Sequence, residues 1–203
     1  MGKQLKHLTG LCVARSGHNF VVQNIMSWFE ENTIVYHNLE NIAPKDLRPL
    51  HLSHGGMKAL IYRDFDDWLA SSIMKSYKAS KPRMVHTLPS FILTVVSTYF
   101  QIRQEAVNPM YFKGSTIIHY DSFVDSAAYR QDICRNFRGD YSEEKLNFVP
   151  ANGHHSSFDG KEFQGKGSEM NVLNRADQIL ETEHKDFYLK IMEEYAGQIR
   201  VFR

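Results

Sequence analysis

The sequence predicts an α/β protein with a central parallel sheet flanked by helices in three layers, formed by one domain over residues 1–203. Two observations lead to this prediction. Short apolar or β-branched segments alternate with segments whose apolar residues recur at helical spacing, which is typical of a parallel sheet covered on both faces. The composition, with 42% hydrophobic and 23% charged residues, is that of a globular chain able to bury a core.

The individual elements follow from local patterns along the chain. Strands are expected where apolar runs are short and bounded by polar or small residues, at 8–14, 33–36, 58–63 and 116–120, with a further candidate at 50–54. Helices are expected where apolar residues return every three or four positions, at 20–29, 64–77, 91–106, 125–137, 142–148 and 175–195. Gly139 and Gly197 are placed to end the helices that precede them.

Charge and composition narrow the classes of partner. The formal net charge is +1, so nothing indicates bulk electrostatic binding to nucleic acid or to an anionic membrane, and any anionic ligand must be held by local groups. The most apolar segment, 91–100, is too short to span a bilayer, and residues 1–11 do not resemble a secretory signal. These features favour a cytoplasmic protein. Cys12 and Cys134 are expected to be buried free thiols, a disulfide between them being the alternative.

The strongest local signal is a strand followed by Arg15-Ser16-Gly17-His18-Asn19-Phe20 and then a helix. The first N–H groups of a helix lack internal partners and lie at the positive end of the helix dipole, so an anion gains several donors there. A glycine lets the backbone approach the ligand, and an arginine adds a fixed positive charge. The segment is neither the G-x-x-x-x-G-K-[ST] loop of nucleotide triphosphatases nor a G-x-G-x-x-G turn. The alternative is an ordinary turn between strand and helix.

A second candidate half-site begins where the strand at 58–63 ends. Arg63 stands at the carboxyl end of that strand, where open α/β sheets bind ligands, and Ser71 lies eight residues later on the next helix. The two side chains can share a phosphate, one by charge and one by its hydroxyl. The alternative is that Arg63 pairs with Asp64 or Asp67 and that Ser71 is a helix-surface residue.

Together these two segments resemble the sulfotransferase family, whose members use 3′-phosphoadenosine 5′-phosphosulfate (PAPS) as sulfuryl donor. The family's first signature reads roughly P-K-S-G-T-T-W, and residues 14–20 lie in its place. Its second signature reads roughly R-[ND]-P-x-D-x-x-x-S, and residues 63–71 match it in spacing. Fainter similarities follow in order at 119–123, 136–139, 142–145, 156–158 and 165–167. The chain departs from the family at Arg15 (for Lys), at His18 and Asn19 (for two Thr) and at Phe65 (for Pro).

The resemblance implies a P-loop-like sulfotransferase fold and assigns roles to particular residues. Arg15 and the loop Ser16-Gly17-His18-Asn19-Phe20 would hold the 5′-phosphosulfate, with Arg15 on the leaving oxygens. Arg63, Ser71 and Lys166 would hold the 3′-phosphate, and Phe20 and Tyr120 would border the adenine. The product would be adenosine 3′,5′-bisphosphate (PAP). The scheme needs no metal.

The resemblance also implies a base for the acceptor, which would be a hydroxyl or amine on a small molecule or glycan. His54, which ends the candidate strand at 50–54, is the first candidate, and His51 is the second. Histidine suits proton abstraction because its pKa lies near neutral pH.

Two other readings stay open. A nucleotide or nucleoside kinase of the P-loop type would require magnesium and a triphosphate, although the Lys-Ser/Thr pair of that loop is missing. A non-catalytic module on the same fold would bind the nucleotide without turnover. The acceptor and the oligomeric state cannot be read from the sequence.

Overall fold

The computed structural model describes residues 5–30, 33–47, 56–79, 88–143 and 173–202. The chain divides into two compact units. The first contains Met1–Arg63 and Gln101–Leu146, and the second contains Asp64–Phe100 and Asn147–Arg203. Helix α4 (Leu88–Val107) contributes to both units, since the division falls after Phe100.

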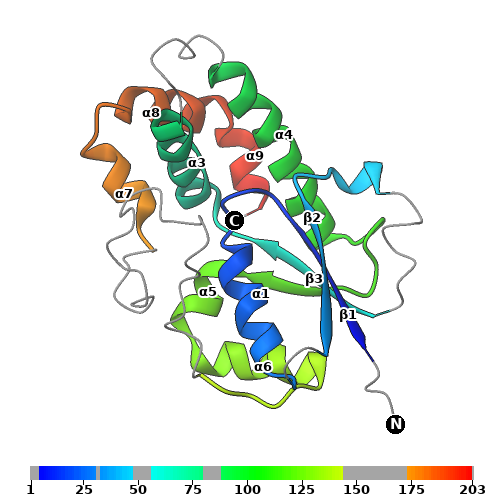
Figure 1. Cartoon of the computed structure of the whole chain (residues 1–203). Coiled ribbons are helices and arrows are strands. Elements are labelled where there is room, and N and C mark those ends of the chain that lie inside the picture. Colours follow the sequence, from blue (N-terminus) through cyan, green and yellow to red (C-terminus); the bar gives the residue numbers. More distant parts are fainter. Residues whose placement is uncertain (1–4, 31–32, 48–55, 80–87, 144–172, 203) are drawn as a thin grey trace. The chain divides into compact units, whose positions relative to one another are not determined.

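The first unit is built on a sheet of four parallel strands (Figure 1). The strands are β1 (Lys6–Cys12), β2 (Ile34–Glu40), β3 (Met57–Tyr62) and β4 (Thr116–His119), and their order across the sheet is β2-β1-β3-β4. The chain passes from β1 to β2 on one side and then crosses to β3 on the other side. The topological switch point therefore lies between β1 and β3, and open α/β sheets bind ligands at the carboxyl edge of such a point.

The predicted α/β class and parallel sheet are confirmed, with helices flanking the strands. The central strands are apolar and buried, as parallel strands covered by helices must be: Leu8, Leu11, Leu60 and Ile61 have no exposed surface. Strand β2 runs to Glu40, four residues further than the spacing predicted. The candidate strand at 50–54 lies outside the described residues, as does most of the predicted helix at 142–148.

Among the described residues, four helical segments belong to the first unit in addition to the end of α4. They are α1 (His18–Ser27), the short 3₁₀ helix η1 (Pro44–Asp46), α5 (Tyr120–Asp125) and α6 (Ala127–Phe137). Ser126 caps α6 by accepting a hydrogen bond from the N–H of Tyr129. The left-handed residue that ends α6 is Arg138, with φ 55°, rather than the predicted Gly139. Gly139 is needed for packing instead, because a Cβ there would lie 2.9 Å from the Cβ of Trp28.

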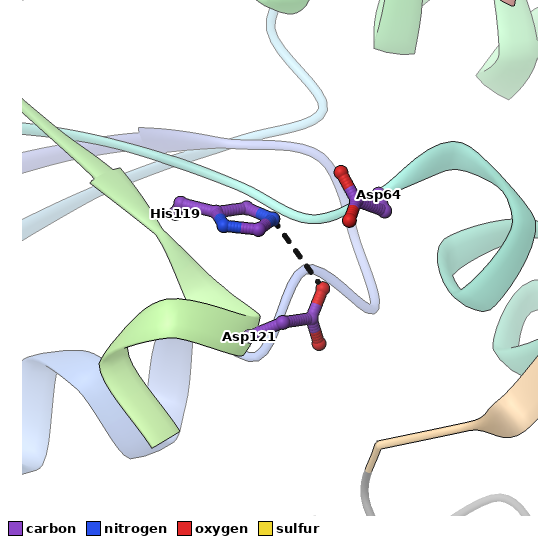
Figure 2. A group of neighbouring side chains, drawn as sticks. All are labelled: Asp64, His119 and Asp121. Carbon is purple, nitrogen blue, oxygen red and sulfur yellow. Dashed lines mark ion pairs between the residues drawn. The ribbon is translucent and has the colours of Figure 1, made fainter. Parts of the chain in front are cut away.

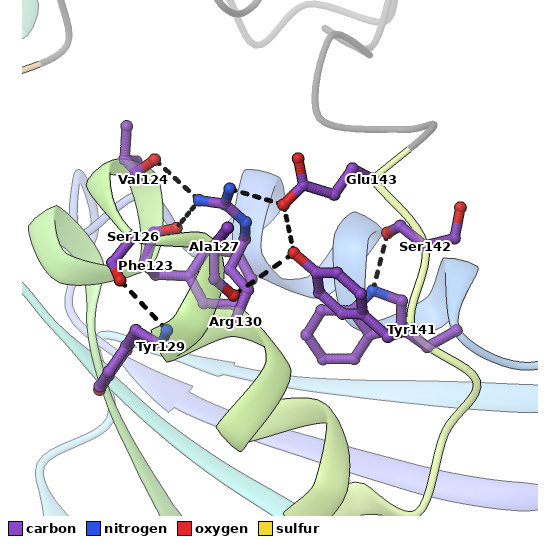
Figure 3. Close-up of polar contacts among 10 residues, drawn as sticks. Phe123, Val124, Ser126, Ala127, Tyr129, Arg130, Tyr141, Ser142 and Glu143 are labelled. Carbon is purple, nitrogen blue, oxygen red and sulfur yellow. Dashed lines mark hydrogen bonds and ion pairs between the residues drawn. The ribbon is translucent and has the colours of Figure 1, made fainter.

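A buried arginine ties α5, α6 and the following segment together (Figure 3). Arg130 donates from Nη1 to the carbonyl oxygens of Phe123 and Val124, at 2.7 and 2.8 Å, and from Nη2 to Glu143 Oε1 at 2.9 Å. Tyr141 also donates to Glu143. These bonds from Tyr141 and Arg130 lower the pKa of Glu143 below its usual value.

The second unit is helical where it is described. It contains α3 (Phe65–Ala79), the first part of α4, α7 (Arg175–Leu180), α8 (Lys185–Glu194) and α9 (Ala196–Val201). Its core is aromatic: the rings of Phe65, Trp68, Tyr99, Phe100 and Tyr195 lie 4.6–6.3 Å apart in successive pairs. Asp67 joins α3 to α7 by accepting a hydrogen bond from the N–H of Ala176 at 2.7 Å.

The prediction of one long helix at 175–195 was wrong, because the chain forms two short helices there, α7 and α8, and α9 follows from Ala196. Thr182 explains the first break: its hydroxyl donates to the carbonyl of Ile179 and accepts from the N–H of His184. Such local bonds offer the backbone an alternative to continuing the helix. Gly197 lies inside α9 and does not end the segment.

Two further expectations concern burial and membrane insertion. Cys12 and Cys134 are both buried free thiols, as predicted. None of the helices that the structure describes combines the length and the apolar character needed to span a bilayer.

Candidate functional site

The loop predicted to bind an anion begins at the carboxyl end of β1, beside the switch point. Asn41, the residue after β2, holds its first turn in place. The N–H of Asn41 donates to the carbonyl of Cys12 at 2.9 Å, and the Asn41 side chain accepts from the N–H of Ala14 at 2.8 Å. The loop therefore leaves the sheet in a defined direction.

The loop backbone leaves several N–H groups without the hydrogen-bond acceptors that they would have inside a helix. Arg15 and Gly17 have positive φ angles of 72° and 77°, on either side of Ser16. The first backbone bond that reaches into α1 runs from the N–H of Val21 to the carbonyl of Gly17, at 3.2 Å. As a result, the N–H groups of Gly17, Asn19 and Phe20 have no acceptor among the described residues. No acidic side chain stands in the first turn of α1, and Gly17 supplies no capping side chain.

This arrangement has the features that suit an anion. Successive free N–H groups at a helix start, next to left-handed residues, form a concave set of donors at the positive end of the helix dipole. Arg15 adds a guanidinium to the same loop. A left-handed arginine costs about 1–2 kcal/mol relative to an ordinary conformation, and such a cost is often found where backbone geometry serves a ligand.

Ser16 provides a second, independent indication of a ligand. Its side chain has no exposed surface, and its hydroxyl has no hydrogen-bond partner within the described part of the chain. A buried hydroxyl without a partner costs about 1–3 kcal/mol, so native proteins rarely retain one. An anion held by the neighbouring N–H groups would supply the missing acceptor.

Tyr120 lies directly beneath the loop and makes Gly17 indispensable. A Cβ on Gly17 would lie 2.0 Å from Tyr120 Cε2, and the positive φ would strain any other residue as well. The Phe20 ring meets the Tyr120 ring edge to face, at 6.3 Å between centroids. Tyr120 begins α5 instead of ending a strand, and only 5% of its surface is exposed.

A carboxylate lies on the other side of the loop. Glu40, the last residue of β2, is 3.5 Å from Nδ1 of His18, which is buried at the first position of α1. Burial, and then the negative charge of Glu40, raise the pKa of the Cys12 thiol well above its ordinary value. Cys12 is a buried core residue at the end of β1, and this shift disfavours its thiolate form.

Arg63 stands at the carboxyl end of β3, next to the switch point, as predicted. The structure gives it a carboxylate partner that the sequence did not indicate, since Arg63 Nε donates to Asp121 Oδ1 at 3.0 Å. The guanidinium also lies 5.1 Å from the centre of the Tyr120 ring. Only 3% of Arg63 is exposed. Tyr120 therefore contacts both the anion-binding loop and Arg63.

Asp121 also pairs with a histidine on its other side. Figure 2 shows Asp121 Oδ2 facing His119 Nε2, at 3.5 Å. The His119 Nδ1 atom lies 2.8 Å from the Ser122 hydroxyl, and its ring stacks on Tyr62 with the centroids 5.0 Å apart. Asp121 thus holds Arg63 and His119 at the carboxyl ends of two adjacent strands.

The structure brings together part of the predicted site. The loop residues Arg15, Ser16, Gly17, His18, Asn19 and Phe20 lie with Tyr120 and Arg63 at one edge of the sheet. Ser71 is buried in α3 and belongs to the second unit, so its pairing with Arg63 stays a prediction. His51, His54 and Lys166 lie outside the described residues.

Sequence reasoning missed Asn41, Glu40 and Asp121. Each directly ends or follows a strand, and polar residues at strand ends are the signal that would have found them.

Comparisons of this chain with protein-family models, with curated proteins and with solved structures find no match.

Proposed function

We propose that this chain binds PAPS and transfers its sulfuryl group to a hydroxyl or amine acceptor on a P-loop-like, three-layer sulfotransferase fold. The observation that carries the proposal is the loop 14–20, which combines three N–H groups without an acceptor among the described residues, the buried Ser16 hydroxyl and the Arg15 guanidinium. These groups suit a tetrahedral anion such as the 5′-phosphosulfate. The similarity of 14–20 and 63–71 to the family's two signatures supports the choice of this anion.

The transfer requires in-line geometry and stabilisation of oxygens. The acceptor oxygen or nitrogen forms a bond to sulfur, the bond between sulfur and the 5′-phosphate oxygen breaks, and PAP leaves with the electron pair. Donors held by the loop stabilise the charge that develops on the leaving oxygen. The acceptor proton goes to a base, for which His54 is the first candidate and His51 the second. A sulfuryl donor reacting in this way needs no covalent enzyme intermediate.

In this proposal Arg63 binds the 3′-phosphate, and its bond to Asp121 supports that role. Its Nε is bonded to Asp121, so the guanidinium is held in a fixed orientation. A fixed arginine loses less side-chain entropy on binding a phosphate than a mobile one. Asp121 would act as a positioning residue for Arg63, while Arg63 meets the 3′-phosphate.

An exposed arginine provides a control for the loop. Arg15→Gly removes the charge at the site and relieves the positive φ, whereas Arg135→Gln removes a positive charge from the exposed surface of α6. We expect both variants to keep their free energy of unfolding within about 1 kcal/mol of the parent. We expect Arg15→Gly alone to weaken PAP binding, by about tenfold or more, measured by calorimetric titration. Equal affinities in the two variants would remove Arg15 from the site.

A further inference from the structure

A groove of about 670 Å³ opens at the amino-terminal ends of β1, β3 and β4. This amino-edge groove is lined by residues that include Leu5, Lys6, Met57, Asn136, Phe137 and Arg138. It lies at the edge of the sheet opposite the loop 14–20, because all four strands run in the same direction. Its volume is within the range of about 300–1,000 Å³ that small-molecule sites occupy.

The described residues that line the amino-edge groove carry only positive formal charge. Lys6, Lys58 and Arg138 are among them, and none of them is an aspartate or glutamate. Lys6 Nζ lies 4.5 Å from the centre of the Phe29 ring, and Lys58 Nζ donates to the carbonyl of Lys113 at 3.2 Å. Within the described residues none of the three forms an ion pair. A groove with cations and without counter-charges favours an anion.

The remaining lining adds an apolar surface beside these cations. Leu5 is 54% exposed, and Met57 and Phe137 continue the apolar wall. Gly114 leaves the groove open, since a Cβ on it would meet no atom within 4 Å. Sites for small molecules typically combine such apolar walls with a few convergent polar groups.

We propose that the amino-edge groove binds a small organic anion. Its apolar body lies against Leu5 and Met57, and Lys6 and Arg138 hold its anionic group, which is a carboxylate, a phosphate ester or a sulfate ester. This site is separate from the loop 14–20 and does not depend on the function proposed for that loop.

The test uses phenyl phosphate as the probe and the full chain labelled with ¹⁵N. Backbone signals of Gly56 and Gly114 report on the amino-edge groove, and that of Gly17 reports on the loop. We expect phenyl phosphate to shift the Gly56 and Gly114 signals, and benzyl alcohol, its neutral counterpart, to leave them unchanged. Lys6→Gln and Arg138→Gly should each weaken this binding by about tenfold.

Arg135→Gln is the matched control, because Arg135 lies on α6 near Arg138, is 77% exposed and does not line the groove. It should change the affinity by less than about twofold. Unmoved Gly56 and Gly114 signals, or equal affinities in all variants, would overturn the proposal. A shift of the Gly17 signal alone would place the probe at the loop, and would overturn the groove without touching the proposed sulfotransferase function.

Discussion

Single residues in the loop 14–20 carry strain that the fold alone does not explain. Arg15 is left-handed without being glycine, and Ser16 buries a hydroxyl that has no partner among the described residues. Residue 17 must be a glycine, because the Tyr120 ring occupies the space that a Cβ would need. Three consecutive residues that depart from ordinary preferences indicate a backbone shaped for a ligand.

Ser16→Ala separates the effect of the buried hydroxyl on the free energy of unfolding from its effect on ligand binding. Removing a buried hydroxyl that has no partner should leave the free energy of unfolding unchanged or raise it by about 1 kcal/mol, measured by urea denaturation. The same variant should bind PAP about tenfold more weakly, because the anion loses a donor. A variant that loses stability and keeps its affinity would show that the hydroxyl serves the fold.

Gly17→Ala tests the contact between the loop and Tyr120. The added methyl group meets the Tyr120 ring and the residue stays at a positive φ, so we expect a loss of about 2 kcal/mol or more in the free energy of unfolding. Gly114→Ala is the control, since its φ is also positive and its Cβ would enter open space. It should lose only the backbone part, about 1 kcal/mol. Similar losses in both variants would mean that Tyr120 does not pack on the loop.

At the scale of elements, the sequence predicted most of the described strands and helices, but it did not predict the breaks in the last helical segment. Segments 58–63 and 116–120 are apolar and bounded by polar residues, and the structure has β3 and β4 there. The apolar stripe of 175–195 could not reveal that Thr182 would bond to its own backbone and break the helix. The sequence also could not indicate the carboxylate partner of Arg63. Asp121 is 58 positions away in the chain and becomes a neighbour of Arg63 only when β3 and β4 pair.

The link between α6 and the segment after it should be sensitive to acid. The pKa of Glu143 is lowered in the folded chain. The Glu143 carboxylate therefore contributes its full stabilisation above its ordinary pKa of 4.5, and this contribution disappears as the pH falls through the lower pKa of the folded chain. Glu143→Gln should therefore be less stable than the parent by about 0.5–1 kcal/mol near pH 7, a small value because the side chain is partly exposed. In urea denaturation between pH 7 and pH 3, the difference should shrink below about pH 4.5. A difference that stays constant with pH would mean that the Glu143 charge does not matter.

At the scale of the whole molecule, the net charge of +1 leaves anion binding to local groups. The parallel sheet brings such groups together, because its strand order β2-β1-β3-β4 puts the loop 14–20 and Arg63 beside one switch point. The sequence predicted both half-sites but not this order, since strand order depends on long-range pairing. It also could not supply the partners Asn41 and Asp121, whose roles follow from that pairing.

If the loop 14–20 and Arg63 bind the nucleotide of a sulfuryl donor, as we propose, calorimetric titration of the unmodified chain will detect that binding. The titrant is adenosine 3′,5′-bisphosphate, and ATP with magnesium is the comparison. We expect the bisphosphate to bind, and ATP with magnesium to bind far more weakly. Binding of ATP with magnesium alone would favour a kinase, and absence of binding by both would contradict the account.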